Sequence, residues 1–385
     1  MVTKLEPSQL QPNPADPRVW PKDRPLDALS NPWPAGTTVV SADSHFLEYF
    51  LEPGAWADRM PAKYRDRAPR GWRDETGFHM EADGKTLDNP GFPSDLIEGR
   101  PGMWDVDLRI ADMDAEGIEK DILFPQRTLG MIRSEDRGYI AACFSAYNEL
   151  VMEHVKPHKD RLFPVGVINY WDEASVRESG EQMKALGFKA MMMPTLPPGE
   201  IYYNSRKLDS MWTAVEDIGL PVSFHVGETF DARGLGGLAT TITVAFGGYR
   251  RLWSLLTFSG VLERHPGLKL VFTEGGIAWV PSALYEADKV YTAFQSEMNP
   301  KLAELPSHYW FKQCYATFMD DPAGLRQLDL MGADRVMWTY DYPHPESTLG
   351  YTQSSLQAVF AAADTVQDAQ AIAGQTAIDL WRLDD

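Results

Sequence analysis

The sequence predicts a parallel (β/α)8 TIM barrel, and three observations lead to this fold class. From residue 37 onward, short runs rich in valine, isoleucine and phenylalanine alternate with longer stretches of helical periodicity. Eight such apolar runs can be counted, which is the number of strands that closes a parallel barrel. No GxGxxG motif follows the first run, and this argues against an open doubly wound sheet, the main competitor.

The strands and helices follow from the apolar spacing. We expect strands at residues 38–45, 120–126, 163–169, 189–194, 221–227, 268–274, 310–318 and 335–341. Residues 137–155 and 208–219 carry apolar side chains at three- and four-residue spacing, as amphipathic helices do, and the first barrel helix is expected at 105–117.

An extended N-terminal arm is predicted before the barrel. Residues 1–36 contain the proline-rich stretches QPNP, DPRVWP and NPWP and little periodicity, whereas residues 37–385 form the barrel domain. The simplest interpretation of the arm is a disordered tail. Trp20 and Trp33 are unusual in a solvated tail, so an arm packed on the barrel or on a neighbouring subunit is the alternative.

Two segments between the predicted strands are longer than simple connections. Residues from about 46 to 104 are polar and rich in turn residues, which indicates an insertion after strand 1, over the barrel mouth, with a short hairpin around Asp83-Gly84. Residues 228–250 follow the fifth strand and contain five glycines, which suits an irregular mobile loop.

Composition excludes several partner classes. The formal net charge of -19 opposes binding to nucleic acid and to anionic membrane surfaces, but not to a small anionic substrate beside a bound cation. Cys143 and Cys314 lie far apart and form no CxxC pair. The first 20 residues lack the apolar core of a signal peptide, and no run of about 18 apolar residues follows. These features predict a cytoplasmic protein.

Acids and imidazoles stand where the predicted strands end. Asp43 and His45 are two residues apart, and therefore on one face of the first strand. The other residues at strand ends are Glu48, His225, Glu274, Asp341 and His344. The carboxyl ends of barrel strands converge on one mouth, where active sites of this fold lie, so we expect all seven to gather there.

Seven such groups at one mouth would repel and desolvate one another without a cation. We therefore predict one or two divalent metal ions, with Asp341 as a ligand and His344 as a second-metal ligand or a proton-transfer residue. An Asp-x-His pair alone is a weak indication of a metal site. The placement of acids and histidines at the ends of several strands is the stronger indication. Gln126 and Arg127 close the second strand and Asn169 closes the third, where they are placed to hold a substrate carboxylate or hydroxyl.

The chain resembles the amidohydrolase superfamily, in the amidohydrolase-2 branch that includes aminocarboxymuconate semialdehyde decarboxylase and resorcylate-type decarboxylases. The stretches that carry the resemblance lie between about residues 39 and 347. They are SADSHFLE, RMPAKYRDRAPR, RIADMDAEGIEKDILFP, YNELVMEHVKPHKDRLFPVGVI, LGFKAMMMP, FHVG, LERHPGLKLVFTEGGIAWVPSALYEAD and DRVMWTYDYPHPES. The resemblance implies that Asp43, His45, His225 and Asp341 are metal ligands.

Two positions depart from the pattern of the superfamily. The first strand carries Asp43-Ser44-His45 where His-x-His is common, and the sixth carries Glu274 where histidine is frequent. With Glu48, the ligand set becomes rich in oxygen, which favours manganese and iron without excluding zinc. Four carboxylates would balance the charge of two ions, which favours two, although one is commoner among the decarboxylase relatives.

The function predicted is that of a metal-dependent enzyme acting on a small carboxylate-bearing molecule. It would hydrolyse its substrate with metal-bound water or remove a carboxylate non-oxidatively from a metal-bound substrate. One alternative is a dinuclear iron or manganese hydroxylase that activates oxygen. Another is a non-catalytic subunit of a hetero-oligomer. The arm would suit assembly into a homo- or hetero-oligomer.

Overall fold

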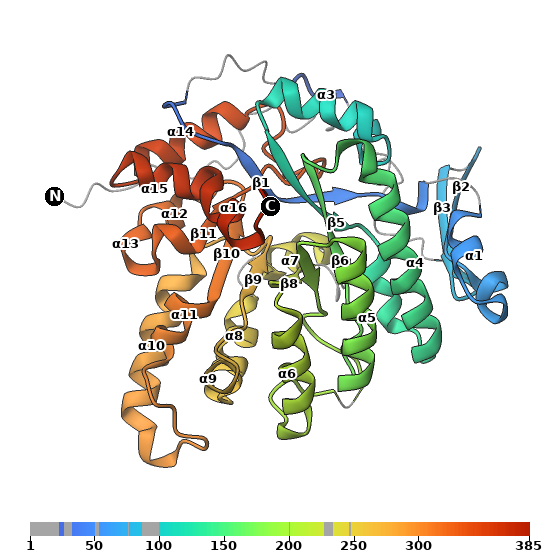
Figure 1. The fold of residues 1–385 in the computed structure, drawn as a ribbon. Helices are drawn as coiled ribbons and strands as arrows, with labels where there is room; N and C mark the ends of the chain where they lie inside the picture. The colour runs from blue at the N-terminus through green and yellow to red at the C-terminus, as the bar shows by residue number, and fades with distance from the viewer. Residues whose placement is uncertain are drawn as a thin grey trace.

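The computed structural model describes residues 23–26, 33–50, 54–75, 77–86, 100–199, 201–226, 234–245 and 248–385. Within them, eight parallel strands lie in the order β1-β5-β6-β7-β8-β9-β10-β11. Their bounds are β1 Val40–Phe46, β5 Lys120–Pro125, β6 Leu162–Val167, β7 Ala190–Met192, β8 Val222–His225, β9 Leu270–Thr273, β10 Cys314–Phe318 and β11 Val336–Trp338. The predicted (β/α)8 barrel is confirmed (Figure 1).

The barrel closes between its first and last strands. Ser44 forms a parallel bridge with Tyr342, just beyond β11, and the backbone N–H of His45 donates to the Tyr342 carbonyl at 2.8 Å. This pairing brings the carboxyl end of β1 beside the segment that follows β11. Residues about 300 positions apart in the sequence thereby become neighbours at the mouth of the barrel.

Helices surround the strands (Figure 1). They are α3 Val106–Glu116, α4 Arg137–Val155, α5 Glu173–Leu186, α6 Asp209–Ile218, α7 Gly237–Ala245, α8 Tyr249–Phe258, α9 Val261–Arg264, α10 Trp279–Phe294, α11 Pro306–Gln313, α12 Pro322–Leu325, α13 Leu328–Met331, α14 Thr352–Ala362, α15 Val366–Gln370 and α16 Thr376–Trp381. The helices predicted at 105–117, 137–155 and 208–219 are confirmed as α3, α4 and α6. Among the described residues, no helix has both the length and the apolar character that crossing a membrane requires.

Two predicted segments differ from the structure. Residues 310–313 belong to α11 and not to the seventh strand, because Pro306 begins a helix that buries Tyr309, Trp310 and Gln313. The aromatic residues that follow the proline are also typical of strands, so the sequence favours a strand there. Part of the segment expected to be irregular is the helix α7, whereas residues 227–233 and 246–247 lie outside the described residues.

Part of the predicted insertion forms a separate small sheet. Its antiparallel strands are β2 Arg70–Asp74, β3 Gly77–Ala82 and β4 Lys85–Thr86, and α1 (Ala55–Arg59) lies nearby. Asp83 and Gly84 both have positive φ, 56° and 66°, as a two-residue hairpin turn requires, so the predicted hairpin is confirmed. Figure 1 places this sheet beside α4. The proposed bounds of the insertion stay a prediction.

The described part of the arm contacts the barrel. The Arg24 guanidinium donates to the carbonyls of Ser347 and Leu349 at 3.2 and 3.1 Å, and Trp33 stacks on Phe360 with ring centroids 5.2 Å apart. Trp20 lies outside the described residues. The boundary at residue 36 and the role of the arm in assembly stay predictions.

Candidate metal centre

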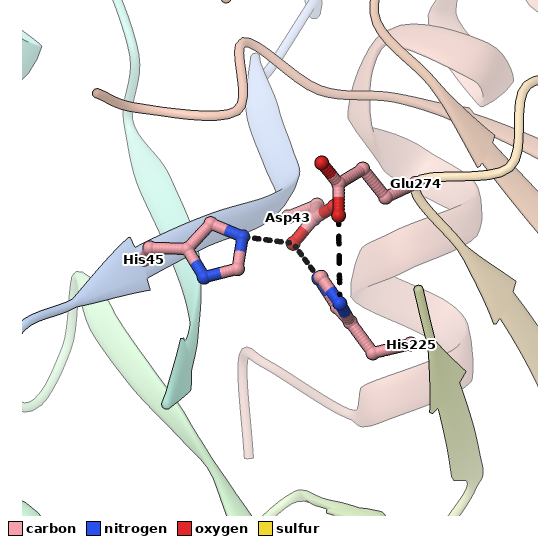
Figure 2. Close-up of side chains that lie close together, drawn as sticks. All are labelled: Asp43, His45, His225 and Glu274. Atoms are coloured by element: carbon pink, nitrogen blue, oxygen red, sulfur yellow. Dashed lines mark hydrogen bonds and ion pairs between the residues drawn. The ribbon is translucent and has the colours of Figure 1, made fainter. Parts of the chain in front are cut away.

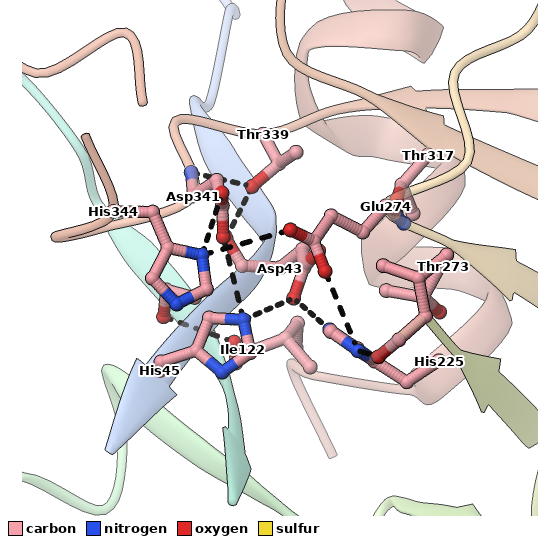
Figure 3. A network of polar contacts seen from close by, with 12 residues as sticks. Asp43, His45, Ile122, His225, Thr273, Glu274, Thr317, Thr339, Asp341 and His344 are labelled. Carbon is pink, nitrogen blue, oxygen red and sulfur yellow. Dashed lines mark hydrogen bonds and ion pairs between the residues drawn. The ribbon is translucent and has the colours of Figure 1, made fainter. Parts of the chain in front are cut away.

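Six ionisable side chains gather at the carboxyl ends of the barrel strands. They come from β1, β8 and the segments after β9 and β11, and they are Asp43, His45, His225, Glu274, Asp341 and His344. They form two overlapping groups that share His45 and Glu274, and the ligand atoms within each group lie within 4.8 Å of one another. Figures 2 and 3 show the side chains pointing toward one another. We call this set the mouth cluster.

The first group contains Asp43, His45, His225 and Glu274 (Figure 2). Asp43 Oδ1 lies 3.3 Å from His225 Nε2 and 3.9 Å from His45 Nε2. The other ring nitrogen of His225, Nδ1, lies 2.8 Å from the Val226 carbonyl and 3.5 Å from Glu274 Oε2. A histidine held at Nδ1 by a carbonyl presents Nε2 as an acceptor, which is the usual arrangement of a metal-binding imidazole.

The second group contains His45, Glu274, Asp341 and His344 (Figure 3). His344 Nδ1 lies 3.0 Å from Asp341 Oδ2 and 3.6 Å from Glu274 Oε1. His45 Nε2 lies 3.4 Å from Asp341 Oδ1, and the rings of His45 and His344 stack at 4.1 Å. Glu274 therefore reaches both groups through its two oxygens.

Two of the acids have an unusual backbone conformation. Glu274 and Asp341 have φ angles of 64° and 52°, in the left-handed region that residues other than glycine adopt rarely. Threonine hydroxyls hold both positions, since the Glu274 N–H donates to Thr317 Oγ1 at 2.9 Å and the Asp341 N–H to Thr339 Oγ1 at 3.0 Å. Such strain persists where the surroundings impose it, and it concentrates at functional sites.

The electrostatics of the mouth cluster are unfavourable without a cation. Burial, followed by the charge of Asp341, raises the pKa of Asp43 well above its usual value and that of Glu274 to about 8. Burial and the nearby His344 lower the pKa of His45 well below its usual value. Each group is therefore pushed toward its neutral form. A divalent cation would reverse this effect for the acids.

Several polar atoms of the mouth cluster are buried without a hydrogen-bond partner. They are Asp43 Oδ2, both ring nitrogens of His45 and Asp341 Oδ1. Buried polar atoms seldom lack a hydrogen-bond partner unless an ion or a water molecule binds them. The donor set of carboxylate oxygens and imidazole nitrogens fits Mn²⁺, Fe²⁺ or Zn²⁺. The residues present thus fit a divalent cation.

Asp341 and His344 form a charged pair inside the cluster. Burial acts to raise the pKa of Asp341, but His344 and His45 outweigh it and the pKa is lowered. Burial acts to lower the pKa of His344, but Asp341 and Glu274 outweigh it and the pKa lies well above its usual value. His344 Nε2 lies 3.2 Å from Gln126 Oε1, so both ring nitrogens face acceptors.

Glu48 does not join the mouth cluster, contrary to the predicted ligand set. Its carboxylate oxygens accept hydrogen bonds from the backbone N–H groups of Gln126, Arg127 and Thr128 and from the Thr128 hydroxyl. The short helical turn Glu48–Phe50 directs this side chain toward the loop after β5. We do not propose Glu48 as a ligand, because its carboxylate is directed to this loop and neither group of the mouth cluster includes it.

The predicted substrate-binding residues differ in their placement. The Gln126 side chain contacts His344, and Arg127 follows it in the same loop. The Asn169 amide donates to the Ser175 carbonyl at 3.5 Å, and its Oδ1 is buried without a hydrogen-bond partner. The structure thus brings Gln126 to the mouth cluster. The substrate-binding roles of all three stay predictions.

A buried ion pair next to the cluster escaped the sequence analysis. Arg109 on α3 and Asp121 on β5 are both fully buried, with Arg109 Nη2 2.8 Å from Asp121 Oδ2. Arg109 Nη1 donates to the His45 carbonyl at 2.8 Å, and Ser44 Oγ donates to Asp121 Oδ1 at 2.7 Å. The one signal was an acid inside the apolar second strand. That acid is Asp121 itself, and it does not indicate Arg109 as its partner.

A parallel barrel with acids and imidazoles buried at its carboxyl-end mouth is suited to an enzyme that uses a divalent cation. The model of the amidohydrolase family matches residues 30–383, and the chain belongs to this family. It is therefore an enzyme, and the alternative of a non-catalytic subunit is not retained. No curated protein sequence matches the chain.

Solved structures with the same fold include an amidohydrolase from Mycobacterium avium subsp. paratuberculosis K-10, with 18% identity, 90% of this chain and 100% of that chain covered, and a TM-score of 0.73. A 5-carboxyvanillate decarboxylase from Sphingomonas paucimobilis has 19% identity, coverage of 90% and 99%, and a TM-score of 0.63. A dihydroxybenzoic acid decarboxylase from Polaromonas sp. JS666, with bound manganese and 2-nitroresorcinol, has 17% identity, coverage of 91% and 98%, and a TM-score of 0.63.

Proposed function

We propose that this protein is a divalent-cation-dependent decarboxylase that removes CO2 without oxidation from a small aromatic carboxylate. The observation that supports the proposal most is the mouth cluster. In it, His344 contacts Asp341 through Nδ1 and lies beside a set of buried atoms that could bind a cation. Two structural relatives support the reaction and the substrate class. One is named a 5-carboxyvanillate decarboxylase and the other a dihydroxybenzoic acid decarboxylase.

The proposed cation ligands are Asp43, His45, His225 and Asp341, with Glu274 able to reach the same ion or a second one. When bound, a divalent cation supplies Lewis acidity that anchors a carboxylate and an adjacent oxygen and draws negative charge away from the reacting carbon. A set of two or three carboxylates with two imidazoles suits manganese, and the Polaromonas structure contains manganese.

His344 is the proposed proton donor. Its side chain is 18% exposed, whereas the other five members of the mouth cluster are at most 7% exposed, so a substrate can reach it. The bond between the ring carbon and the carboxylate breaks, and its electron pair stays on the carbon. That carbon takes the proton from His344 Nε2, and CO2 leaves. Asp341 holds the ring through Nδ1, and water returns the proton afterwards.

Gln126 and Arg127 are the proposed substrate-binding residues. Gln126 contacts the nitrogen of His344 that would donate the proton, and Arg127 follows in the loop after β5. In this proposal Arg127 pairs with a second anionic group of the substrate, in the bidentate way that arginine binds carboxylates.

A second candidate, oxygen-dependent hydroxylation, is favoured by one feature. The two overlapping groups contain three carboxylates in all, and this set would suit two iron or manganese ions. The two reactions differ in their need for oxygen. Full turnover under anaerobic conditions would exclude the hydroxylase, whereas oxygen consumption that depends on substrate and iron would exclude the decarboxylase.

The decisive assay measures CO2 released by Mn²⁺-loaded protein from a panel of hydroxybenzoates and methoxybenzoates. We expect CO2 from at least one compound, with deuterium from D2O on the carbon that lost it. His344→Asn should lower kcat about 10²- to 10⁴-fold, because it removes general acid catalysis, and the metal content should be kept. A product of hydrolysis without CO2 would favour the hydrolase instead. CO2 release that His344→Asn leaves unchanged would contradict the role of His344.

A further inference from the structure

Glu48 is a fully buried carboxylate whose four hydrogen bonds all go to one loop. Oε1 accepts from the N–H of Arg127 at 2.9 Å, the N–H of Thr128 at 2.6 Å and the Thr128 hydroxyl at 2.6 Å. Oε2 accepts from the N–H of Gln126 at 3.0 Å. Three successive backbone N–H groups that converge on one carboxylate form an anion-binding nest, and here the anion belongs to the same chain.

The loop held in this way leads directly to the mouth cluster. Gln126 Oε1 lies 3.2 Å from His344 Nε2, and the opposite nitrogen of that ring lies 3.0 Å from Asp341 Oδ2. Contacts therefore run without a break from Glu48 through the backbone of residue 126 to the imidazole. On its own side, Glu48 is fixed because the Trp56 indole donates to its carbonyl at 3.3 Å.

We propose that Glu48 is a positioning residue, which holds the loop of residues 126–128 so that Gln126 orients His344. The link to proton transfer rests on the proposed function, whereas the anchoring of the loop does not. Hydrogen bonds to an ionised acceptor are about twice as strong as neutral ones, so a carboxylate suits this task better than an amide. Burial raises the pKa of Glu48, and hydrogen bonds from the Thr128 hydroxyl and from backbone N–H groups that include those of Arg127 and Gln126 oppose that shift.

The test compares three full-length variants. Glu48→Gln replaces one acceptor oxygen with an NH2 group that would face a backbone N–H. Thr128→Val keeps Glu48 but removes the hydroxyl donor, and it serves if Glu48→Gln does not fold. Gln126→Ala leaves the anchor intact and removes the contact with His344. Three quantities are measured, namely amide hydrogen exchange at residues 126–128, Mn²⁺ bound per chain, and kcat and KM for CO2 release.

We expect Glu48→Gln to speed amide exchange at residues 126–128 about 10- to 100-fold, since charged hydrogen bonds are lost, and to leave the Mn²⁺ content unchanged. Thr128→Val should give a smaller acceleration. Glu48→Gln and Gln126→Ala should both lower kcat, but Gln126→Ala should leave exchange at residues 127 and 128 as in the wild type. Loss of Mn²⁺ in Glu48→Gln, or unchanged exchange, would overturn the proposal. If the wild type releases no CO2, amide exchange and Mn²⁺ content still test whether Glu48 anchors the loop.

Discussion

At the scale of single residues, the ion pair of Arg109 and Asp121 contributes to stability and also contacts the backbone of His45, a member of the mouth cluster. Both side chains are fully buried, and the guanidinium also donates to the carbonyls of His45 and Gly102 at 2.8 and 3.2 Å. Tyr340 donates its hydroxyl to Asp121 Oδ2 at 3.0 Å. The pair is hydrogen-bonded on all sides, so a loss of one partner would leave the other charge buried and uncompensated.

Arg109→Met should therefore lower the free energy of unfolding by about 3–5 kcal/mol, because it leaves Asp121 alone in the interior. The double variant Arg109→Met/Asp121→Leu should recover a large part of this loss, since neither charge remains. Urea unfolding monitored by tryptophan fluorescence measures both effects. Equal losses in the single and double variants would mean that packing, and not the buried charge, dominates.

The sequence predicts the place of a residue where regular strands fix it, and it does not predict contacts between separate elements. The sequence predicts the gathering of five residues, because the strand ends of a barrel meet at one mouth, and they are Asp43, His45, His225, Glu274 and Asp341. Their roles as cation ligands stay predictions. Glu48 lies outside the mouth cluster, and the sequence could not predict this, since its partners depend on the path of a loop that no periodicity describes. Arg109 was missed for a related reason. Its partner Asp121 lies on a different element, and pairing across elements leaves no local pattern.

At the scale of elements, the π-helical turn Ala371–Gln375 packs closely on the start of the barrel. A Cβ added at Gly374 would overlap the carbonyl oxygen of Thr38 and lie 3.1 Å from Val40 Cγ2. Both neighbours belong to β1 or the residues just before it. The absence of a side chain at Gly374 thus allows the C-terminal segment to cover the first strand.

We expect Gly374→Ala to destabilise the protein by about 1–3 kcal/mol, the usual cost of overpacking, because a backbone atom must move to make room. Gly130→Ala is a suitable control, since no atom lies within 4 Å of a Cβ added there. Thermal unfolding of both variants gives the comparison. If Gly374→Ala melts with the control and the wild type, the close approach to Thr38 does not constrain the fold.

The elements themselves were largely predictable. All eight strands were located, because buried parallel strands have continuous apolar runs that helices interrupt regularly. The two differences arose where a local signal was ambiguous. Residues 310–313 are aromatic, yet Pro306 starts a helix through them, and the small and β-branched residues of α7 form a helix despite their weak propensity.

At the scale of the whole molecule, the mouth cluster is a source of instability that a cation would remove. Removal of divalent ions should lower the melting temperature, because folding would then bury mutually repelling acids. A cation at about 100 times its Kd adds about 2.7 kcal/mol to the free energy of unfolding. We expect a chelator to lower the melting temperature by a few degrees and Mn²⁺ to restore it. An unchanged melting temperature after verified removal of metal would speak against this linkage.

Asp341→Asn provides a matched control for the chelation experiment. The variant removes one negative charge and one ligand, so its melting temperature should respond less to chelator and to Mn²⁺ than that of the wild type. An equal response in both proteins would indicate that the ions act elsewhere on this acidic chain, whose net charge is -19.

Elemental analysis after equilibration with Mn²⁺ and gel filtration shows directly whether the mouth cluster binds a divalent cation. We expect at least one Mn²⁺ per chain in the wild type and almost none in the variant Asp43→Asn/Asp341→Asn, with circular dichroism unchanged. Equal Mn²⁺ content in the two proteins would mean that the mouth cluster does not bind the cation.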